Sequence, residues 1–524
     1  MLHLTRRMVT LAVATATLTL AAAQAATAGP LQDDLVQRRA RVMEKLGPDT
    51  LFVVWSAPEQ VYSMDVDYEY RQDSNMLYLT GVEQEGTILV LMPGNKTKKS
   101  ILFVHEPNPT REHWTGHLLT RDEAKALSGV DAVEYVSQFD AFIANMFSQM
   151  PYRLGGPTGA PGTGAAGAGG GMPGAPRVGG TGAEEFETFF KAVADGHPKL
   201  ALMFGPRPQS TAPLTRPYEF ARDLRDRVLN VTFVDAQQIV YALRQVKTPF
   251  EQTAMRQSVD ISSDAHMAGM RATAPGKYEY QVRAAIEHVY MDRGAMIWGY
   301  PSIVGSGPNS LVLHYTADRR KMEAGDLLLV DAAASYQGMT GDITRTYPVS
   351  GRFTPAQKDI YRICLVAQDA GRKVAAAGKT VADIRDAISE SLKAGLLELA
   401  LITDTKGDQF RRWATHGPVH WIGMDVHDVG NVARPLEPGM MFVMEPGVYI
   451  RQAALDTLPD TPENRAWKEQ IAPAFQKYKG IGVRIEDSFL LGESGLVSLS
   501  AKVPRTIEEI EAFFAKESST AKAP

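Results

Sequence analysis

Four apolar segments in the C-terminal half of the chain have the residue composition of β-strands, and each carries an acidic residue or ends directly before one. These segments are residues 326–334, 341–349, 441–444 and 481–491, and their acidic residues are Asp331, Asp342, Glu445 and Glu486. Branched and bulky apolar side chains with turn residues alongside favour strands at these positions. Strands that present carboxylates to one another need a cation between them, because like charges placed opposite each other are destabilising.

The first two segments are expected to pair as a β-hairpin with its turn at residues 336–338. In this register Asp331 and Asp342 are cross-strand neighbours, with Cβ atoms about 4.5 to 5.5 Å apart. Each carboxylate could then reach a divalent cation at about 2 Å. A solvent-exposed pair at the rim of the hairpin is the alternative that this motif leaves open.

Three of the eleven histidines fall within twelve residues, at His416, His420 and His427. Imidazole can ligate a metal in its neutral form and can transfer a proton near neutral pH, so the cluster indicates a functional site rather than packing. Arg484 precedes Glu486 by two residues. Strand alternation therefore places both on one face, where the guanidinium can orient a carboxylate. Taken singly, either glutamate is also compatible with a simple charge at a strand end.

Two domains are predicted, an N-terminal α/β domain at residues 30–245 and a second domain at 246–515. In the first, short apolar runs such as 51–55, 87–92 and 100–105 alternate with polar segments, as strands do. In the second, helices are expected at 249–272, 281–293 and 355–377, with proline near the start of two of them. The expected fold class is therefore α/β, or α+β.

Residues 155–183 interrupt the first domain with thirteen glycines and four prolines among twenty-nine positions. Such a composition offers too little apolar side chain to offset the entropy of ordering the backbone. We expect a disordered surface insertion. A glycine-rich phosphate-binding loop is not indicated, because the flanking strand, helix cap and glycine spacing are missing.

Residues 1–28 have the features of a secretory signal peptide. Arg6 and Arg7 precede an apolar stretch at residues 8–23, which is followed by small residues suited to cleavage. We expect export by the general or the twin-arginine route, to a periplasmic or secreted location; a membrane anchor is the alternative. No stable membrane insertion of the mature protein is expected, because later segments fall short of the ~18 continuous apolar residues of a membrane helix.

Charge and cysteine content argue against a nucleic-acid-binding protein and against a fold stabilised by disulfides. The net charge is -5, from 55 basic and 60 acidic residues, and neither sign forms a long run. Nucleic acid is therefore not expected as a partner. The single cysteine, Cys364, cannot form an intrachain disulfide.

The order of the acidic and histidine residues resembles the ligand order of the metal-dependent pita-bread peptidases, most closely the aminopeptidase P (Xaa-Pro aminopeptidase) branch. Residues 70–81, Tyr-Arg-Gln-Asp-Ser-Asn-Met-Leu-Tyr-Leu-Thr-Gly, are similar to a signature of that branch's first domain. The resemblance implies a C-terminal pita-bread (creatinase/aminopeptidase) catalytic domain that binds two divalent ions. The implied metal ligands are Asp331, Asp342, His420, Glu445 and Glu486. Their four carboxylates balance the charge of two divalent ions, and the oxygen-rich ligand set favours Mn²⁺, with Co²⁺ or Zn²⁺ as alternatives.

The resemblance also implies roles beside the metals. His314 and His427 would bind substrate and stabilise the transition state, and His416 would be a nearby site residue. Glu445 would shuttle a proton and Arg484 would orient the ligands. The implied substrate-binding residues also include Trp114 and Tyr449. Trp114 resembles an aromatic residue that related enzymes project into a neighbouring subunit, which implies a homo-oligomer, dimer or tetramer; the alternative is a partly buried core tryptophan.

The implied activity is hydrolysis of the N-terminal Xaa-Pro bond of peptides by a metal-bridging hydroxide, and peptides with proline at the second position are the expected partners. A prolidase, which shares the ligands but cleaves Xaa-Pro dipeptides, is the main alternative. A methionine aminopeptidase fits less well because it usually lacks so large an N-terminal domain. A metal-free creatinase-like hydrolase and a non-enzymatic pita-bread binding module fit less well because they should have lost these ligands.

Overall fold

The computed structural model describes residues 29–152, 154, 183–206, 208–209 and 211–520. The predicted signal peptide, and all of the predicted glycine-rich insertion except Ala183, lie outside these residues. The chain divides into two compact units, Met1–Gln237 and Gln238–Pro524. The boundary expected at residues 245 and 246 thus falls inside the second unit. Each unit is described separately.

The N-terminal unit is built on a six-stranded mixed sheet, in the order β6-β5-β4-β1-β7-β8. The pairs β1/β4 and β4/β5 are antiparallel, and β1/β7, β5/β6 and β7/β8 are parallel. Every residue of β4 and β5 is buried, which explains why these strands read as continuous apolar runs in the sequence. The strands are β1 (Thr50–Trp55), β4 (Ile88–Leu91), β5 (Ser100–Val104), β6 (Ala132–Tyr135), β7 (Lys199–Leu202) and β8 (Thr232–Asp235).

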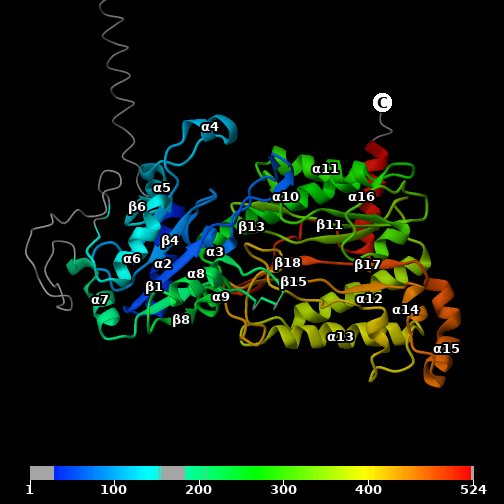
Figure 1. Cartoon of the computed structure of the whole chain (residues 1–524). Coiled ribbons are helices and arrows are strands. Elements are labelled where there is room, and N and C mark those ends of the chain that lie inside the picture. Colours follow the sequence, from blue (N-terminus) through cyan, green and yellow to red (C-terminus); the bar gives the residue numbers. More distant parts are fainter. Residues whose placement is uncertain (1–28, 153, 155–182, 207, 210, 521–524) are drawn as a thin grey trace, which may run out of the picture. The chain divides into compact units, whose positions relative to one another are not determined.

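Helices and one small hairpin complete this unit (Figure 1). The hairpin is β2 (Val61–Ser63) and β3 (Val66–Asp67), and its residues are exposed. The helices are α2 (Pro30–Leu46), α3 (Ser74–Thr80), α4 (Pro109–Thr115), α5 (Arg121–Ser128), α6 (Phe139–Phe147), α7 (Glu187–Ala194) and α8 (Arg216–Arg225).

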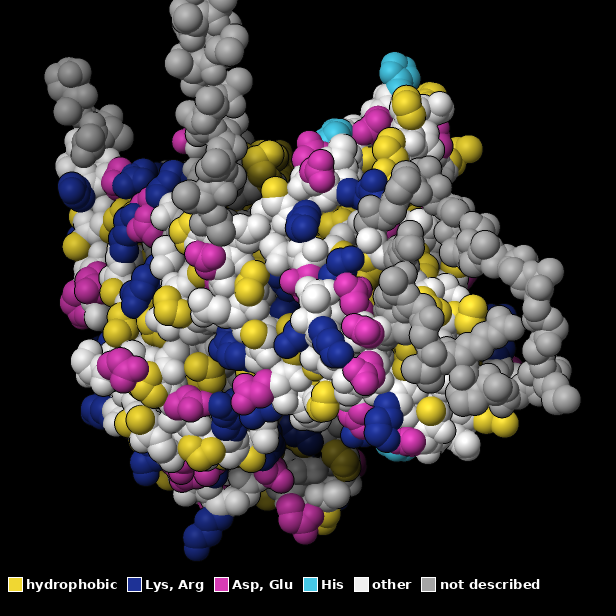
Figure 2. Space-filling model, turned by 90° about the vertical axis from the view of Figure 1, so that its left-hand side faces the viewer, with side chains coloured by type: hydrophobic (Ala, Val, Ile, Leu, Met, Phe, Trp, Pro, Cys, Tyr) yellow, Lys and Arg dark blue, Asp and Glu magenta, His cyan; other side chains and the backbone are white. Residues whose placement is uncertain are grey.

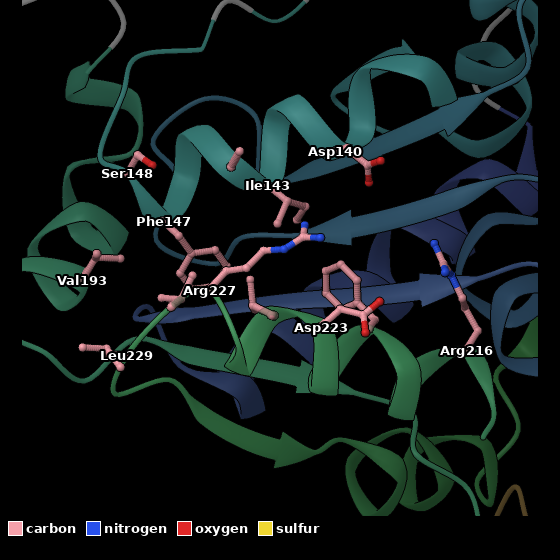
Figure 3. Close-up of a pocket in the computed structure, with 13 residues that line it drawn as sticks. Asp140, Ile143, Phe147, Ser148, Val193, Arg216, Asp223, Arg227 and Leu229 are labelled. Carbon is pink, nitrogen blue, oxygen red and sulfur yellow. The ribbon is translucent and has the colours of Figure 1, made fainter. Parts of the chain in front are cut away.

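A cavity of about 710 Å³ lies beside α6 and α8 in this unit (Figure 3). Its wall combines apolar side chains such as Phe147 with the charged side chains of Arg216, Arg227 and Asp223. None of the site residues predicted from the sequence lines this cavity. It therefore plays no part in the chemistry derived below.

The described surface carries both signs of charge side by side. Figure 2 shows basic and acidic side chains interspersed over one face. Oppositely charged side chains also form ion pairs in the N-terminal unit, such as Lys191 with Asp195 and Arg222 with Asp223. Among the residues that the structure describes, no helix combines the length and apolar character required to cross a bilayer.

The second unit places several short antiparallel sheets between two pairs of helices (Figure 1). Helices α10 (Pro249–Ala272) and α11 (Glu279–Asp292) lie on one side of the strands, and α12 (Pro355–Val374) and α13 (Val381–Glu398) on the other. The remaining helices are α9 (Gln237–Arg244), α14 (Ala453–Asp456), α15 (Pro462–Tyr478) and α16 (Ile507–Thr520).

The strands of this unit form four small sheets, β10-β11-β14, β13-β12-β9, β15-β18-β19 and β16-β17. Most of their residues are buried. Strands β11, β14, β15, β17 and β18 lie in or overlap the segments predicted from the sequence, whereas β9, β10, β16 and β19 were not predicted. The strands are β9 (Ile297–Trp298), β10 (Ile303–Ser306), β11 (Leu327–Asp331), β12 (Ala334–Tyr336), β13 (Met339–Thr340), β14 (Thr344–Pro348), β15 (Met441–Met444), β16 (Gly447–Tyr449), β17 (Gly482–Arg484), β18 (Asp487–Gly492) and β19 (Gly495–Ser498).

Local sequence fixes the starts of the long helices. Thr248 and Glu251 form a reciprocal capping box around Pro249, so α10 spans the predicted residues 249–272. Helix α11 begins two residues before the predicted start. Helix α12 ends at Val374, before the predicted residue 377, because Ala375 has an extended backbone.

The predicted register of the central hairpin is wrong by two residues. Asp331 pairs with Thr344, and the turn lies at Gln337 and Gly338, which both have positive φ. Since side chains alternate with a period of two, a shift of two residues leaves Asp342 on the same face as Asp331. The two carboxylates are therefore diagonal rather than direct neighbours.

The predicted strand at residues 481–491 is two strands in two different sheets. β17 pairs with β16, and β18 pairs with β15. Glu486 lies between them, and its backbone bridges to Thr344. The break thus places an acidic side chain where three short sheets meet.

Candidate metal centre

The ends of short strands bring the predicted ligands together. Asp331 is the last residue of β11, and Glu445 directly follows β15. Asp342 lies between β13 and β14, and Glu486 between β17 and β18. His420 comes from the irregular segment beside β15, where Trp421 bridges to Phe442.

The His420 imidazole lies at the centre of three of these carboxylates. Its Nε2 atom is 3.5 Å from Asp342 Oδ2, 3.4 Å from Glu445 Oε1 and 3.7 Å from Glu486 Oε1. Asp342, His420 and Glu486 each offer a ligand atom, and these atoms lie within 4.8 Å of one another. The Nδ1 atom of His420 is 3.0 Å from the carbonyl oxygen of Trp421, to which it donates, so Nε2 is left to act as a ligand.

Arg484 and Thr344 link Asp331 to Glu486 through a chain of hydrogen bonds. Arg484 Nη2 donates to Asp331 Oδ2 at 2.5 Å, and Arg484 Nε donates to Thr344 Oγ1 at 3.3 Å. Thr344 Oγ1 in turn donates to Glu486 Oε2 at 2.6 Å. The predicted orienting role of Arg484 is therefore geometrically reasonable, because one guanidinium links the positions of two predicted ligands.

Tyr300 bridges the two aspartates, and sequence reasoning missed this residue. Its hydroxyl is 2.6 Å from Asp331 Oδ1 and 2.5 Å from Asp342 Oδ1. Burial and the charges of the two aspartates raise the pKa of Tyr300 well above its usual value, so the hydroxyl keeps its proton. One phenolic proton can serve only one of the two contacts. The hydroxyl therefore donates to Asp331 or to Asp342 and keeps both carboxylates within its reach.

The electrostatics of the cluster favour protonation when no cation is present. Burial, followed by the charges of Glu486 and Asp331, raises the pKa of Asp342 well above its usual value. Burial and Glu486 raise the pKa of Glu445 to about 8. Burial alone would lower the pKa of His420, but Glu486 and Glu445 outweigh it and raise that pKa to about 9. Protons and a metal cation therefore compete for this site.

His416 lies beside the cluster and contacts Glu445 and Tyr449. His416 Nδ1 is 3.4 Å from Glu445 Oε2, and its Nε2 is 2.9 Å from the Tyr449 hydroxyl. Burial and Arg484 lower the pKa of His416 to about 4, so its ring is neutral and Nε2 accepts a hydrogen bond from the Tyr449 hydroxyl. A Cβ atom on Gly447 would come within 2.7 Å of His416 Nε2, which explains the need for glycine there.

Tyr449 is buried rather than open to a substrate. It is 1% exposed, and its hydroxyl accepts from Arg484 Nη1 at 2.8 Å while contacting His416. These contacts indicate that Tyr449 orients its neighbours. The predicted substrate-binding role for Tyr449 has no support from this geometry.

His314 and His427 line the open side of the cluster. The ring centroids of His427 and His420 are 4.4 Å apart, and those of His427 and His314 are 6.5 Å apart. Both His314 and His427 are exposed, unlike the predicted ligands. Although part of its surface is open to solvent, partial loss of hydration and the neighbouring His420 lower the pKa of His427, so its ring is neutral near neutral pH.

Trp114 belongs to the N-terminal unit, on α4. It is 82% exposed, which contradicts the alternative of a partly buried core tryptophan. Its predicted role in a neighbouring subunit remains a prediction.

An unpaired buried oxygen gives a direct test of whether a metal fits. Glu486 Oε1 is buried and has no hydrogen-bond partner among the described residues, while it lies 3.7 Å from His420 Nε2. Leaving such an oxygen unpaired is costly, and a cation would satisfy it. The donors are oxygen atoms and one imidazole nitrogen, which suits a hard or intermediate divalent ion. The residues present therefore fit a divalent metal.

Two sequence families match the chain. Residues 253–493 match metallopeptidase family M24, and residues 35–153 match the N-terminal domain of aminopeptidase P. The Xaa-Pro aminopeptidase of Escherichia coli (strain K12) is 31% identical over 496 residues, covering 92% of this chain and 97% of that protein. The Xaa-Pro dipeptidase of Homo sapiens is 28% identical over 484 residues, covering 87% and 86%.

Solved structures give the same result. Aminopeptidase PepP of Pseudomonas aeruginosa has a TM-score of 0.74 and 28% identity, and covers 94% of this chain and 100% of that chain. Aminopeptidase P of E. coli with the inhibitor Pro-Leu has a TM-score of 0.73 and 29% identity, with coverages of 93% and 99%. Both are similar to this chain across its two units.

Proposed function

The chain belongs to metallopeptidase family M24, in its aminopeptidase P branch, and from this premise we propose that it is a Xaa-Pro aminopeptidase. It would remove the N-terminal residue from peptides whose second residue is proline. The observation that carries this proposal is the buried cluster around His420, within a chain that aligns with nearly the whole of a Xaa-Pro aminopeptidase.

Two divalent ions would be held by the five clustered residues. Four carboxylates offset the charge of two such ions, whereas a single ion would leave the cluster anionic. When bound, two divalent ions activate a water molecule and polarise the carbonyl of the scissile bond. The oxygen-rich donor set makes Mn²⁺ the proposed metal, with Co²⁺ and Zn²⁺ as the alternatives. The residues that would hold the ions are Asp331, Asp342, His420, Glu445 and Glu486.

Glu445 is the proposed proton carrier. Its carboxylate lies within the cluster, with Oε1 3.4 Å from His420 Nε2 and Oε2 3.4 Å from His416 Nδ1. It would accept a proton from the attacking water and deliver it to the proline nitrogen as the peptide bond breaks. Burial and Arg484 lower the pKa of His416 beside it to about 4, which makes that imidazole a weak competitor for the proton.

His427 and His314 are the proposed substrate contacts. The neutral His427 ring can donate a hydrogen bond to the carbonyl oxygen as negative charge develops on it. His314 faces His427 and would help to hold the peptide beside it. Arg484 and Thr344 would keep Asp331 and Glu486 in place through the bonds described above.

Release of the first residue from a Xaa-Pro-Xaa tripeptide tests the proposal. The Glu445→Gln protein should lose at least about a hundredfold in kcat, because loss of a general base typically costs 10²–10⁴-fold. Glu469→Gln, a change at an exposed helical position, is the matched control and should retain wild-type activity. Wild-type activity in the Glu445→Gln protein would reject the proposed role.

The prolidase alternative is separated by substrate length. A dipeptidase requires the free carboxylate of a Xaa-Pro dipeptide, whereas an aminopeptidase accepts an extended chain. Faster cleavage of Xaa-Pro-Xaa than of Xaa-Pro supports the proposal, and cleavage of the dipeptide alone would favour a prolidase.

We also propose that the protein is exported, on the basis of residues 1–28. N-terminal sequencing of protein from a periplasmic or culture fraction should begin after the small residues at positions 23–28. An intact N-terminus on cytoplasmic protein would contradict this.

A homo-oligomer is proposed from the exposure of Trp114. Trp114 resembles an aromatic residue that related enzymes project into a neighbouring subunit, and its 82% exposure leaves it available for such a contact. Sedimentation should give a dimer or tetramer, and Trp114→Ala should reduce kcat/KM. A fully active monomer would contradict the proposal.

A further inference from the structure

The segment that carries His314 is packed at alternate positions. Leu311, Leu313 and Tyr315 contact a small buried cluster of Ile303, Leu329 and Tyr449. Val312 and His314, which lie between them, are exposed. The backbone on both sides of His314 is therefore anchored while its imidazole is left free to face His427.

A single buried carboxylate ties this segment together. Glu279, the first residue of α11, is 0% exposed. Its Oε1 atom accepts from the backbone nitrogen and Oγ of Ser306, both at 2.7 Å, and from Asn309 Nδ2 at 3.0 Å. Its Oε2 atom accepts from the Tyr315 hydroxyl at 2.9 Å and from the Arg320 backbone nitrogen at 2.8 Å. All five donors lie in residues 306–320, the stretch that contains His314.

Physical chemistry makes this carboxylate a strong anchor. A buried ionised carboxylate is stable only when donors satisfy its oxygens, and bonds to a charged acceptor are shorter and stronger than neutral ones. The start of α11 adds a favourable dipole for negative charge. Breaking any one of these hydrogen bonds, including the one from Tyr315, therefore costs free energy.

A second anchor acts on the other side of His314. Arg484 Nη2 donates to the carbonyl oxygen of Leu313 at 3.3 Å, and the same guanidinium binds Asp331. The residue before His314 is thus tied to a predicted metal ligand, and the residue after it is tied to Glu279. This two-sided attachment fixes the position of His314 relative to the cluster.

We propose that Glu279 and Tyr315 are positioning residues that hold His314 against the site, an inference that rests on the proposed aminopeptidase function. The Tyr315–Glu279 hydrogen bond is the specific link. It fixes the backbone next to the imidazole, while neither residue contacts the substrate.

Tyr315→Phe removes that link, together with the longer hydrogen bond that the Arg319 backbone nitrogen donates to the same hydroxyl at 3.4 Å, and keeps the packed ring. It is preferred to Glu279→Gln, which takes the negative charge from a buried position with five donors and so endangers the fold. Tyr280→Phe is the matched control, since Tyr280 is half exposed and stacks on Tyr278 in the same unit.

The kinetic readout is a double-mutant cycle with His314→Ala on a Xaa-Pro-Xaa tripeptide. Tyr315→Phe should lower kcat/KM about tenfold when His314 is present and less than about twofold when it is absent, because the effect passes through His314. Its melting temperature should fall by a few degrees relative to Tyr280→Phe, because one hydrogen bond to a buried carboxylate is lost while the ring stays packed, and the protein should remain folded at the assay temperature. An equal loss in both backgrounds, or no loss in either, would overturn the proposal.

A readout that needs no activity is the ¹³Cε1 NMR signal of His314, assigned by its absence in His314→Ala. In Tyr315→Phe this signal should shift or broaden while those of distant histidines stay in place. A His314 signal identical to that of the wild type would overturn the positioning role. Failure of the wild type to cleave Xaa-Pro-Xaa would instead contradict the proposed function, and the NMR comparison would still decide the position of His314.

Discussion

Removing the Tyr300 hydroxyl should weaken metal binding without unfolding the protein. In Tyr300→Phe the ring keeps its packing, but Asp331 and Asp342 lose the group that lies 2.6 and 2.5 Å from their oxygens. Without it the two carboxylates are free to rotate away from each other. Metal binding must then reorient both carboxylates, which weakens the affinity for the metal.

The size of the effect follows from the single phenolic proton. The hydroxyl carries one proton and so donates one hydrogen bond at a time, to a charged carboxylate. Such a bond contributes roughly 1.5–3 kcal/mol, and loss of a partner that orients a metal ligand costs about 10- to 100-fold in metal affinity. We therefore expect the Kd for Mn²⁺ to rise by about 10- to 100-fold.

Competition with a fluorescent chelator at a fixed neutral pH measures this Kd. Tyr290→Phe is the matched control, because Tyr290 is buried in the same unit and its hydroxyl has no hydrogen-bond partner among the described residues. The control should bind Mn²⁺ as the wild type does. A Kd for Tyr300→Phe within about threefold of the wild-type value, or an equal loss in the control, would refute this reasoning.

Two further predictions concern stability. Asp428 accepts from Arg244 Nη2 at 2.5 Å and from Lys247 Nζ at 2.9 Å, and all three side chains are buried. Asp428→Asn should therefore lower the free energy of unfolding, measured by urea denaturation, by roughly 3–5 kcal/mol. A loss below about 1 kcal/mol would contradict this. In the metal-free protein Glu445 and His420 hold protons that the unfolded chain has already released, because their pKa values are raised to about 8 and about 9. Stability in chelator should therefore fall as pH rises from 7 to 9, and added Mn²⁺ should oppose the fall; a rise with pH in chelator would be inconsistent with these pKa shifts.

The residues that cluster around His420 could be identified from the sequence because their signal is local. Each acidic ligand sits in or directly after an apolar strand-like run, and the histidine cluster stands out in a chain with eleven histidines. The bounds of α10 and β15 also match the prediction, since a capping box and a short apolar run mark them clearly. Local patterns of this kind are the ones that sequence reasoning reads well.

The hairpin register failed because several residues around 336–338 could form the turn. The structure uses Gln337 and Gly338, and the sequence offers no decisive pattern that favours them. The error did not mislead the site prediction, since a two-residue shift keeps Asp342 on the correct face.

Residues that act over long sequence distances escaped prediction. Tyr300 lies 31 residues before Asp331, and Glu279 lies 36 residues before Tyr315. No periodicity or spacing rule connects such pairs. Thr344 could have been identified from the sequence, because it follows Asp342 by two residues and strand alternation places the two side chains on one face.

The most direct test of the account is anomalous diffraction at the manganese edge from crystals grown with Mn²⁺. Two peaks are expected about 3.5–4 Å apart, both in contact with the Asp342 carboxylate and together bounded by Asp331, His420, Glu445 and Glu486. No peak at this cluster, or peaks bound only elsewhere on the protein, would contradict the central claim that these five side chains hold the catalytic metals.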